Sequence, residues 1–479
     1  MSSFTAPTPV VSDGPQPKGR RQTELTMLLF AVGIVAFAFI NVGYGLDNKL
    51  PVSMVEYLIA FGVLLAGAHV AMRRFAPYAD PLLLPLAALL NGLGMVMIYR
   101  LQESGRNGNI GNVVPSLSTS AAATQILYSA VGIGCFIGVL VLIKEPRVLQ
   151  RYTYTLGAVG VVLIALPAML PARISEVSGA YDAKIQIAFG SFFTIQPEEF
   201  AKLALAASFA GYLVAKRDVL ALAGRRVLGI DLPRARDLGP ILIAWAASLL
   251  LLVFESDVGT SAVFMGLFVA MLYIATSRTS WLLIGFLMFV VGAFAASKLV
   301  SHVGVRFSVW LHPFSHANVT SGNSYQTLQG LYGMANGGLL GKGLGAGSPA
   351  FTPLVQSDFI VTAFGEELGL AGLMAILLIY GLIVQRGLRT ATAVKDPYSK
   401  LLAGGLSFML ALQVFVIVGG VTRLIPLTGI TTPFLSQGGS SLVASWMLIG
   451  LLARLSNTAR RPPPRPIQDE GLTQVVMLT

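Results

Sequence analysis

The sequence predicts an all-α polytopic integral membrane protein that crosses the bilayer about twelve times. Three observations predict this fold class. Hydrophobic residues make up 54% of the 479 residues and charged residues only 11%, far below the roughly 25% that is usual in soluble domains. The mean hydropathy is +0.73. Apolar runs recur along almost the whole chain and leave no stretch for a separate soluble domain.

Each predicted span is an apolar run long enough to cross roughly 30 Å of hydrocarbon as a helix. The predicted spans lie near residues 24–44, 54–72, 81–99, 122–143, 152–170, 199–215, 237–254, 259–276, 280–297, 359–385, 401–421 and 438–454. The first run follows Lys18, Arg20 and Arg21, but it is long enough to span and no convincing cleavage site follows it. We therefore interpret it as a span and not as a signal peptide.

The net charge of +11 could indicate nucleic acid binding, so the placement of the basic residues matters. With the N-terminus inside, the tails and alternate loops hold 23 of the 33 Lys and Arg residues, and the opposite loops hold nine. The remaining one, Lys202, lies within a span. This bias follows the positive-inside rule and predicts that both termini are cytoplasmic. The basicity is thus a feature of topology and of contact with anionic membrane lipids, and no nucleic acid partner is expected.

The predicted membrane domain covers residues 24–454 and includes a long extracytoplasmic loop at 298–358, before the tenth span. Loops of this length are usually functional or disordered. Aromatic and apolar residues spread through this one predict that it folds against the outer membrane surface. The tails, 1–23 and 455–479, lack the apolar residues needed to order themselves and are predicted to be disordered.

Charged residues inside predicted spans are the most informative class, because an ionised group at mid-bilayer is costly and faces the bundle interior or water. Gln196 stands just before the sixth span, where Glu199 and Lys202 follow at i and i+3 on one helical face and can form an ion pair. This pair is either purely structural or part of a hydrated cavity that binds a charged ligand group.

A second group of charges opens the tenth span. Asp358 precedes an apolar run, which is typical of a helix N-cap, and a capping position would lower the pKa of its carboxyl unless burial raised it again. Glu366 and Glu367 lie two turns further on and cannot be caps. They need cationic partners, for which Lys202, Arg306 and Arg423 are the candidates.

Two glycine-rich segments could form a binding loop or a break in a helix. The segment 337–345 fails the P-loop pattern, because Gly343 stands where Ser or Thr must follow Lys342 and no strand precedes it. Its backbone amides can still form an anion-binding concavity, but a flexible re-entrant turn is the favoured interpretation. The segment 426–441, with two prolines and three glycines at membrane depth, predicts a broken helix that lines a sheltered cavity. Neither a disulfide nor a Cys-based zinc site can form with Cys135 alone, and no His, Cys and carboxylate cluster has metal-ligand spacing.

Several of these motifs occur together, and in the same order, in a known family. They are QPEEFAK (196–202), ESDVGTS (255–261), SYQ (324–326), GLLGKGLG (338–345), SDFI (357–360), GEELG (365–369), PLTG (426–429) and GGSS (438–441). In these residues the chain resembles the SEDS family, which includes RodA, FtsW and SpoVE. The resemblance covers about residues 180–455.

The resemblance implies a membrane glycosyltransferase that polymerises lipid II alongside a class B penicillin-binding protein, in the bacterial cytoplasmic membrane. The essential Asp of the family's Asp-Phe-Ile motif matches Asp358, so this residue is the expected catalytic group, most simply a general base in a displacement with inversion. No cofactor is firmly implied, although a divalent cation (Mg or Mn) could assist the leaving pyrophosphate. The residues expected to contact substrate are Gln196, Glu199, Lys202, Arg306, Tyr325, Gln326, Lys342, Glu366, Glu367 and Ser440.

Other functions remain open at the level of sequence. A lipid II flippase would also carry charges and broken helices in its spans, but internal repetition between the two halves is not evident. A non-catalytic scaffold for a transpeptidase is disfavoured because Asp358 is retained. Within the family, the short C-terminal tail favours a cell-elongation (RodA) role over a division-specific (FtsW) role.

The predicted topology can be tested by cysteine labelling in a variant whose native Cys135 is replaced by alanine. Thr320→Cys and Ser348→Cys should react with a membrane-impermeant thiol reagent added outside, because the predicted extracytoplasmic loop contains both positions. Leu228→Cys should react only after permeabilisation. Reversed labelling would show that the number of spans is wrong by an odd number.

Overall fold

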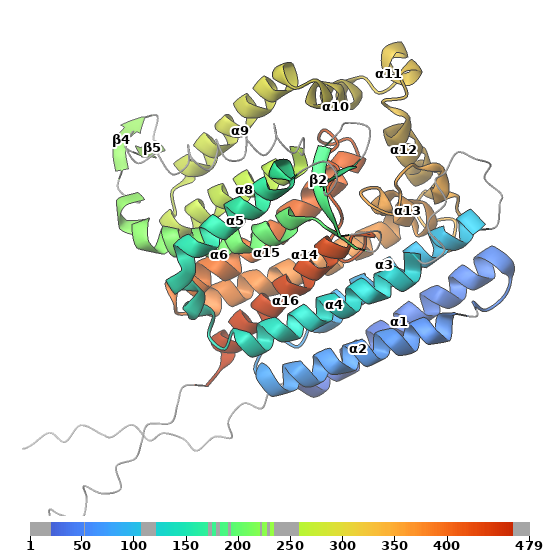
Figure 1. The fold of residues 1–479 in the computed structure, drawn as a ribbon, viewed down its shortest axis with the longest axis horizontal. Helices are drawn as coiled ribbons and strands as arrows, with labels where there is room; N and C mark the ends of the chain where they lie inside the picture. The colour runs from blue at the N-terminus through green and yellow to red at the C-terminus, as the bar shows by residue number, and fades with distance from the viewer. Residues whose placement is uncertain are drawn as a thin grey trace, which may run out of the picture.

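Long helices run through the molecule side by side, and short helices and strands fill the connections between them (Figure 1). This computed structural model describes residues 21–51, 53–106, 121–170, 175–178, 183–189, 193–220, 223–227, 230–233 and 258–462. Its long helices are α1 Arg21–Asp47, α2 Met54–Phe75, α3 Leu83–Arg106, α4 Ala121–Leu142, α5 Thr153–Met169, α6 Pro197–Leu220, α8 Val258–Thr276, α9 Thr279–Leu299, α14 Gly369–Ala393, α15 Pro397–Val421 and α16 Gly439–Arg460.

Ten helices in the described part of the chain are long and apolar enough to cross a membrane. They correspond to ten of the predicted spans and confirm a helical, polytopic membrane protein. Helix α6 coincides with the predicted span 199–215 but is not among the ten, since it carries acidic residues in its first turn and Arg217 in its last. The predicted span 237–254 lies outside the described residues, so the count of twelve stays a prediction.

The helical domain is longer at both ends than the predicted 24–454. Helix α1 begins at Arg21 and α16 continues to Arg460. Both arginines make contacts within the bundle: Arg21 pairs with Glu24, and Arg460 pairs with Asp80. These ion pairs explain why the helices extend into segments whose composition predicts disorder.

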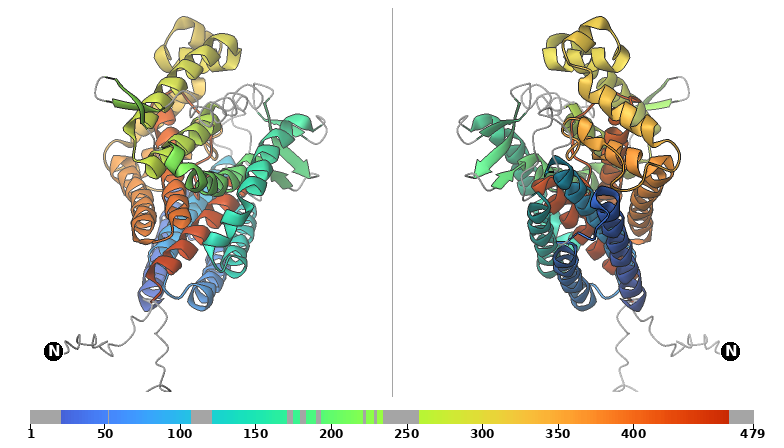
Figure 2. Two further views of the ribbon diagram at one scale, coloured as in Figure 1. Left: turned by 90° about the vertical axis from the view of Figure 1, so that its left-hand side faces the viewer. Right: turned by 90° about the vertical axis from the view of Figure 1, so that its right-hand side faces the viewer.

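Helices α3, α15 and α16 form the centre of the bundle, where most of their side chains are buried. Helix α16 packs on α4, α15 packs on α14 and α8, and the hairpin of α1 and α2 packs on α3 and α4. Helices α5 and α9 are mostly exposed, which fits a position facing lipid. Figure 2 shows the start of α1 and the end of α16 at one end of the bundle and the segment after α9 at the other.

Short antiparallel strands flank α6, which a purely helical prediction did not include. Strands β1 Ser175–Ser178, β2 Ala183–Phe189 and β3 Phe193–Ile195 form one sheet in that order before α6. Strands β4 Ala223–Val227 and β5 Ile230–Pro233 form a hairpin after it. These segments are connections between long helices, so the helical class of the fold is unchanged.

The segment predicted as the long loop 298–358 is itself folded. It contains α10 Ser301–Leu311, α11 His316–Thr320, α12 Tyr325–Gly337 and the 3-10 turn Pro349–Phe351. Figure 1 shows α10 and α11 continuing from α9 and leading into α12, which lies beside α13. This agrees with the expectation that apolar and aromatic residues in the loop give it an ordered structure.

The predicted tenth span, 359–385, is not one continuous helix. It is divided into α13 Ile360–Glu367 and α14 Gly369–Ala393, with Gly369 at a φ of 67°. The glycine-rich segment 338–343 lies against this break: the Lys342 and Gly343 amides donate to the Glu366 and Glu367 carbonyls at 3.1 and 2.9 Å. The Leu370 and Ala371 amides donate to the carbonyls of Gly338 and Leu339 at 2.9 and 3.0 Å. The segment thereby satisfies backbone groups on both sides of the break.

Candidate active site

Asp358 lies at the end of the folded loop, immediately before α13, and only 9% of the residue is exposed. The Ser357 hydroxyl donates a hydrogen bond to Asp358 Oδ1 at 3.0 Å. The N-cap position of α13 belongs to Phe359 and no side chain caps the helix. The capping interpretation of Asp358 is therefore wrong, and its carboxylate is held by its immediate neighbours instead.

Burial raises the pKa of Asp358 from 3.8 to about 6, because a charged carboxylate is poorly solvated in apolar surroundings. The hydrogen bond from Ser357, the backbone amides of Asp358 and Phe359, and the positive charge of Arg306 lower the pKa, but they offset only part of the desolvation. A carboxyl group with this pKa is ionised at neutral pH and still basic enough to accept a proton in a reaction.

Arg306 and Arg423 join α10 to the segment 422–438. Arg306 Nη1 donates to the Thr428 carbonyl at 3.1 Å, and Arg423 Nη2 donates to the Trp310 carbonyl at 3.0 Å. The Trp310 indole returns a hydrogen bond to the Arg423 carbonyl at 3.1 Å. Arg306, one of the residues expected to contact substrate, thus lies near enough for its positive charge to act on Asp358. Arg423 holds the segment 422–438 against α10.

The segment 422–438 connects α15 to α16 without helical structure, in agreement with the predicted break, and it lies against the residues next to Asp358. The Gln437 amide donates to the Gln356 carbonyl at 2.8 Å, and the Ser436 hydroxyl donates to the Ser357 carbonyl. Ser436 also accepts a hydrogen bond from the Thr432 amide at 2.8 Å. Ser436 was not singled out from the sequence, because nothing local distinguishes it from other serines in a glycine-rich stretch.

The predicted ion pair between Glu199 and Lys202 is present, with Nζ and Oε2 2.8 Å apart and both side chains almost fully buried. Lys202 Nζ also donates to Gln413 Oε1 on α15 at 3.3 Å, and Gln413 Nε2 donates to the Thr431 carbonyl at 3.2 Å. The pair is thereby connected to the segment 422–438, which also contacts Ser357.

Gln196 and Ser440 come together although 244 residues separate them: the Gln196 amide donates to the Ser440 hydroxyl at 2.9 Å. This bond joins the start of α6 to the first turn of α16. The Gln196 side chain donates to Glu198. Two motifs that are distant in the sequence thus form one polar region around the start of α6.

Glu366 and Glu367 do not pair with Lys202, Arg306 or Arg423, so that expectation is wrong. Glu367 pairs with Arg100 of α3 and accepts the Gly345 amide at 3.2 Å. Glu366 accepts the Ser348 amide at 2.9 Å and Asn336 Nδ2 at 3.2 Å. These bonds give the two carboxylates a role inside the protein, between α13 and the glycine-rich segment.

Sequence reasoning missed Arg100 as the partner of Glu367. The signal in the sequence is a cation at the end of an apolar run, where it contributes to the charge bias of the loops. The Arg100 guanidinium also donates to the Gly347 carbonyl at 2.5 Å, which anchors the chain just after the glycine-rich segment to α3. A buried guanidinium requires an acidic partner, and here that partner is distant in the sequence, so residue spacing does not reveal it.

The remaining predicted contact residues lie in the folded loop. Tyr325 begins α12 and is 41% exposed, and Gln326 Nε2 donates to the Pro353 carbonyl at 3.0 Å. The side chain of Lys342 is exposed. The amides of Lys342, Gly343 and Gly345 are bonded to Glu366 and Glu367, so the segment does not offer these amides to a phosphate.

The described residues contain no group of three or more His, Cys, Asp or Glu side chains that could hold a metal ion. A divalent cation at this site would therefore need oxygen ligands from the substrate in addition to Asp358. The arrangement as a whole presents one buried carboxylate with a raised pKa, a nearby guanidinium and a connected set of buried polar groups.

The Glu199–Lys202 pair yields a stability prediction. Lys202→Ala leaves Glu199 buried without its cation and should lower the free energy of unfolding by about 3–5 kcal/mol. The double variant Glu199→Lys with Lys202→Glu restores opposite charges at the same spacing and should recover much of the apparent Tm in detergent. If the pair also faces substrate, activity will remain low in the swapped protein. A fully active swapped protein would assign both residues to the scaffold.

Asp358 yields a prediction about pH. Folding raises the pKa of Asp358 from 3.8 to about 6. Its carboxyl therefore does not lower the free energy of unfolding at pH below 3.8, lowers it increasingly as the pH rises from 3.8 to about 6, and lowers it by a constant amount above that. At roughly 1.4 kcal/mol for each pH unit, the cost at neutral pH is about 3 kcal/mol. Asp358→Asn should therefore raise the apparent Tm at pH 7.5 and raise it much less at pH 4.5. An equal change in apparent Tm at both pH values would contradict the raised pKa of Asp358.

Comparison with known proteins identifies the family. A model of the FtsW, RodA and SpoVE family, described as "Cell cycle protein", matches residues 81–461. The chain is 47% identical to "Peptidoglycan glycosyltransferase RodA" of Mycobacterium bovis over 95% of this chain and 94% of that protein. It is 31% identical to "Stage V sporulation protein E" of Bacillus subtilis over 80% of this chain and 98% of that one.

Solved structures share the fold. The rod shape determining protein RodA of Thermus thermophilus superposes with a TM-score of 0.51 at 22% identity, over 80% of this chain and 98% of that one. A chain of a peptidoglycan synthase complex superposes with the same TM-score, 0.51, at 21% identity, over 85% of this chain and 98% of that one. The helical membrane bundle, the order of the motifs and the extent of these matches together show that the chain belongs to the FtsW, RodA and SpoVE family, that is, the SEDS family.

Proposed function

We propose that this chain is a peptidoglycan glycosyltransferase that polymerises lipid II into glycan strands at the outer face of the bacterial cytoplasmic membrane. The observation that carries this proposal is Asp358, a buried carboxylate with a pKa of about 6 in the motif that the family's catalytic Asp occupies. The name of the mycobacterial relatives, peptidoglycan glycosyltransferase, supports the reaction class.

In the proposed mechanism Asp358 is the general base. It takes the proton from the acceptor sugar hydroxyl as the hydroxyl oxygen attacks the anomeric carbon of the donor. The bond from that carbon to the lipid pyrophosphate breaks, and the undecaprenyl pyrophosphate leaves with the bonding electrons. A single displacement by a single carboxylate inverts the configuration at the anomeric carbon. A base with a pKa of about 6 is ionised at neutral pH and retains enough basicity for the step.

Positive charge is needed where the pyrophosphate leaves. Arg306 is suited to this role because it lies on the folded loop near Asp358 and is held to the Thr428 carbonyl at 3.1 Å. Lys342, exposed at the glycine-rich segment, could contact the lipid carrier's phosphates from outside. A bound Mg or Mn ion would add positive charge there, but the described residues supply no three-ligand cluster and the mechanism assigns no step to it.

The buried pair Glu199 and Lys202 contributes to the polar region that adjoins the segment 422–438, in which Thr431 accepts from Gln413. We assign Gln196, Glu199, Lys202 and Ser440 to the substrate-facing side of this region. Tyr325 and Gln326, at the start of α12, are assigned to the entrance from the outer face. Glu366 and Glu367 are assigned to positioning α13 and not to substrate contact, since their carboxylates are bonded to Arg100, Asn336 and backbone amides.

A class B penicillin-binding protein is the proposed partner that crosslinks the product. One solved structure with the same fold comes from a complex described as coordinating polymerization and crosslinking, which supports a paired arrangement. The proposed orientation has both termini in the cytoplasm and α10 to α12 outside. The role is cell-wall elongation, because identity is 47% to the mycobacterial RodA and 28% to an FtsW of Geobacter metallireducens.

The proposal is tested with purified protein, with and without its partner, incubated with lipid II and assayed for glycan chains. Asp358→Asn removes the base while retaining size and should lower polymerisation by about 10²–10⁴-fold. Glu56→Gln, an exposed carboxylate on α2, is the matched control and should retain full activity. Polymerisation by wild-type protein should fall about tenfold for each pH unit below 6, where Asp358 becomes protonated. Near-normal glycan synthesis by folded Asp358→Asn would refute the catalytic assignment.

A further inference from the structure

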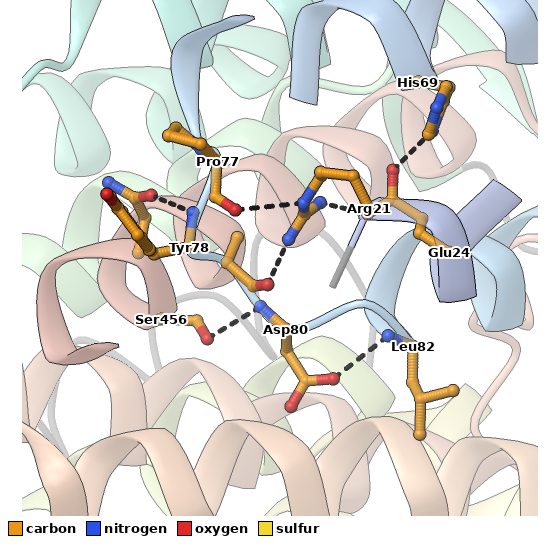
Figure 3. A network of polar contacts seen from close by, with 10 residues as sticks. Arg21, Glu24, His69, Pro77, Tyr78, Asp80, Leu82 and Ser456 are labelled. Atoms are coloured by element: carbon orange, nitrogen blue, oxygen red, sulfur yellow. Dashed lines mark hydrogen bonds and ion pairs between the residues drawn. The ribbon is translucent and has the colours of Figure 1, made fainter. Parts of the chain in front are cut away.

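The hairpin of α1 and α2 lies outside residues 81–461, which the family model matches, and the proposed mechanism does not use it. One end of the hairpin is fixed by buried charges (Figure 3). Arg21 pairs with Glu24, and His69 of α2 contacts the same carboxylate at 2.8 Å. Arg21 also donates to the Pro77 carbonyl at 3.1 Å and to the Ala79 carbonyl. Arg21 is therefore attached to the connection between α2 and α3 through backbone acceptors.

The other end of α1 meets the glycine-rich segment backbone to backbone. A Cβ added at Gly45 would lie 2.4 Å from the Leu344 carbonyl oxygen and 3.0 Å from the Gly345 Cα. In the opposite direction, a Cβ at Gly345 would lie 2.8 Å from the Val42 carbonyl oxygen. Two glycines therefore permit a contact that no larger residue allows at either position. Backbone atoms cannot move away by a change of rotamer as a flexible side chain can, so a larger residue at either position would displace the backbone.

The segment that Gly45 touches, together with Ser348 just after it, carries the amides that hold the acidic pair. The Gly343 amide donates to the Glu367 carbonyl at 2.9 Å, the Gly345 amide to the Glu367 carboxylate at 3.2 Å, and the Ser348 amide to the Glu366 carboxylate at 2.9 Å. Glu366 and Glu367 end α13, whose residues are all buried and which begins two residues after Asp358. A chain of direct contacts thus runs from α1 through the segment and α13 to Asp358.

We propose that the α1–α2 hairpin is a brace that sets the position of the glycine-rich segment, and that Gly45 is a positioning residue for Asp358. The proposal rests on the catalytic role of Asp358 in the proposed function. The fixed end at Arg21 prevents the hairpin from sliding, and the close contact at Gly45 transmits its position to α13. The brace acts through geometry, since the three atoms nearest to an added Cβ at Gly45 all belong to the backbone of the segment.

The size of the expected effect follows from the contact distances. Ordinary van der Waals contact begins at 3.4 Å, so the 2.4 Å approach at Gly45 obliges the segment to move by about 1 Å when a methyl group is added. A misplacement of about 1 Å originating away from the chemistry can lower turnover by about 10²-fold. Apart from Lys342, the proposed substrate contacts lie outside the segment, so the effect should appear mainly in kcat and only weakly in KM.

The experiment compares Gly45→Ala with Gly33→Ala, on the same helix. Gly33 has nothing within 4 Å of an added Cβ, so its replacement matches the chemistry without the contact. We expect Gly45→Ala to lower kcat for lipid II polymerisation by about 10- to 100-fold with KM changed less than about twofold. Gly33→Ala should match wild type in both. Equal kcat in the two variants overturns the proposal.

A second measurement does not depend on activity. Hydrogen exchange at the amides of Gly343, Gly345 and Ser348 reports the bonds to Glu366 and Glu367 directly, and Gly45→Ala should speed this exchange while Gly33→Ala should not.

If wild-type protein makes no glycan, the proposed function fails but this comparison still tests the brace. If Gly45→Ala does not fold, Leu344→Ala loosens the same segment without a backbone clash and should give the same exchange pattern. Unchanged exchange in a folded variant refutes the brace.

Discussion

Inside a membrane, backbone groups freed by a broken helix have no water to bind, and this constraint governs the region around Asp358. The break between α13 and α14 exists because the segment 338–343 donates to the last carbonyls of α13 and accepts from the first amides of α14. Gly369, at a φ of 67°, allows the chain to turn there, and a Cβ at this position would lie 2.3 Å from the Gly341 nitrogen. Without this segment, the end of α13 and the start of α14 would have unsatisfied backbone groups.

The same constraint explains the buried charges. Glu366 and Glu367 look like substrate ligands in the sequence, yet their carboxylates are occupied by Arg100, Asn336 and backbone amides. Breaking such a buried set by removing one member is costly, because the others stay buried without partners. The acidic pair therefore stabilises the position of α13. Among the described residues, Asp358 has neighbouring donors and the more distant charge of Arg306 as its partners, which makes it the carboxyl proposed to react.

Two loops far apart in the sequence are brought together by hydrogen bonds from a backbone amide and from the side chains of Arg306, Arg423 and Ser436. Gln437 donates to the Gln356 carbonyl at 2.8 Å, next to Ser357 and Asp358, while Gln413 connects the same segment to Lys202. Intramembrane polar groups thus form one connected set between α6, α15 and the segment 422–438. A connected set of this kind resists rearrangement, which suits a site whose carboxyl must hold its geometry while a large lipid-linked substrate binds.

The sequence by itself determined the helical membrane class, most of the spans, the i, i+3 pair of Glu199 and Lys202, and Asp358 as the residue to examine. The first three follow from the length of the apolar runs and from helical periodicity. Asp358 was indicated by the resemblance of its motif to that of the SEDS family. Only the tertiary structure decided that the tenth span is broken, that Arg100 and not Lys202, Arg306 or Arg423 pairs with Glu367, and that Asp358 is no cap. Those outcomes depend on which distant backbone groups come within hydrogen-bond distance, and local sequence carries no record of that.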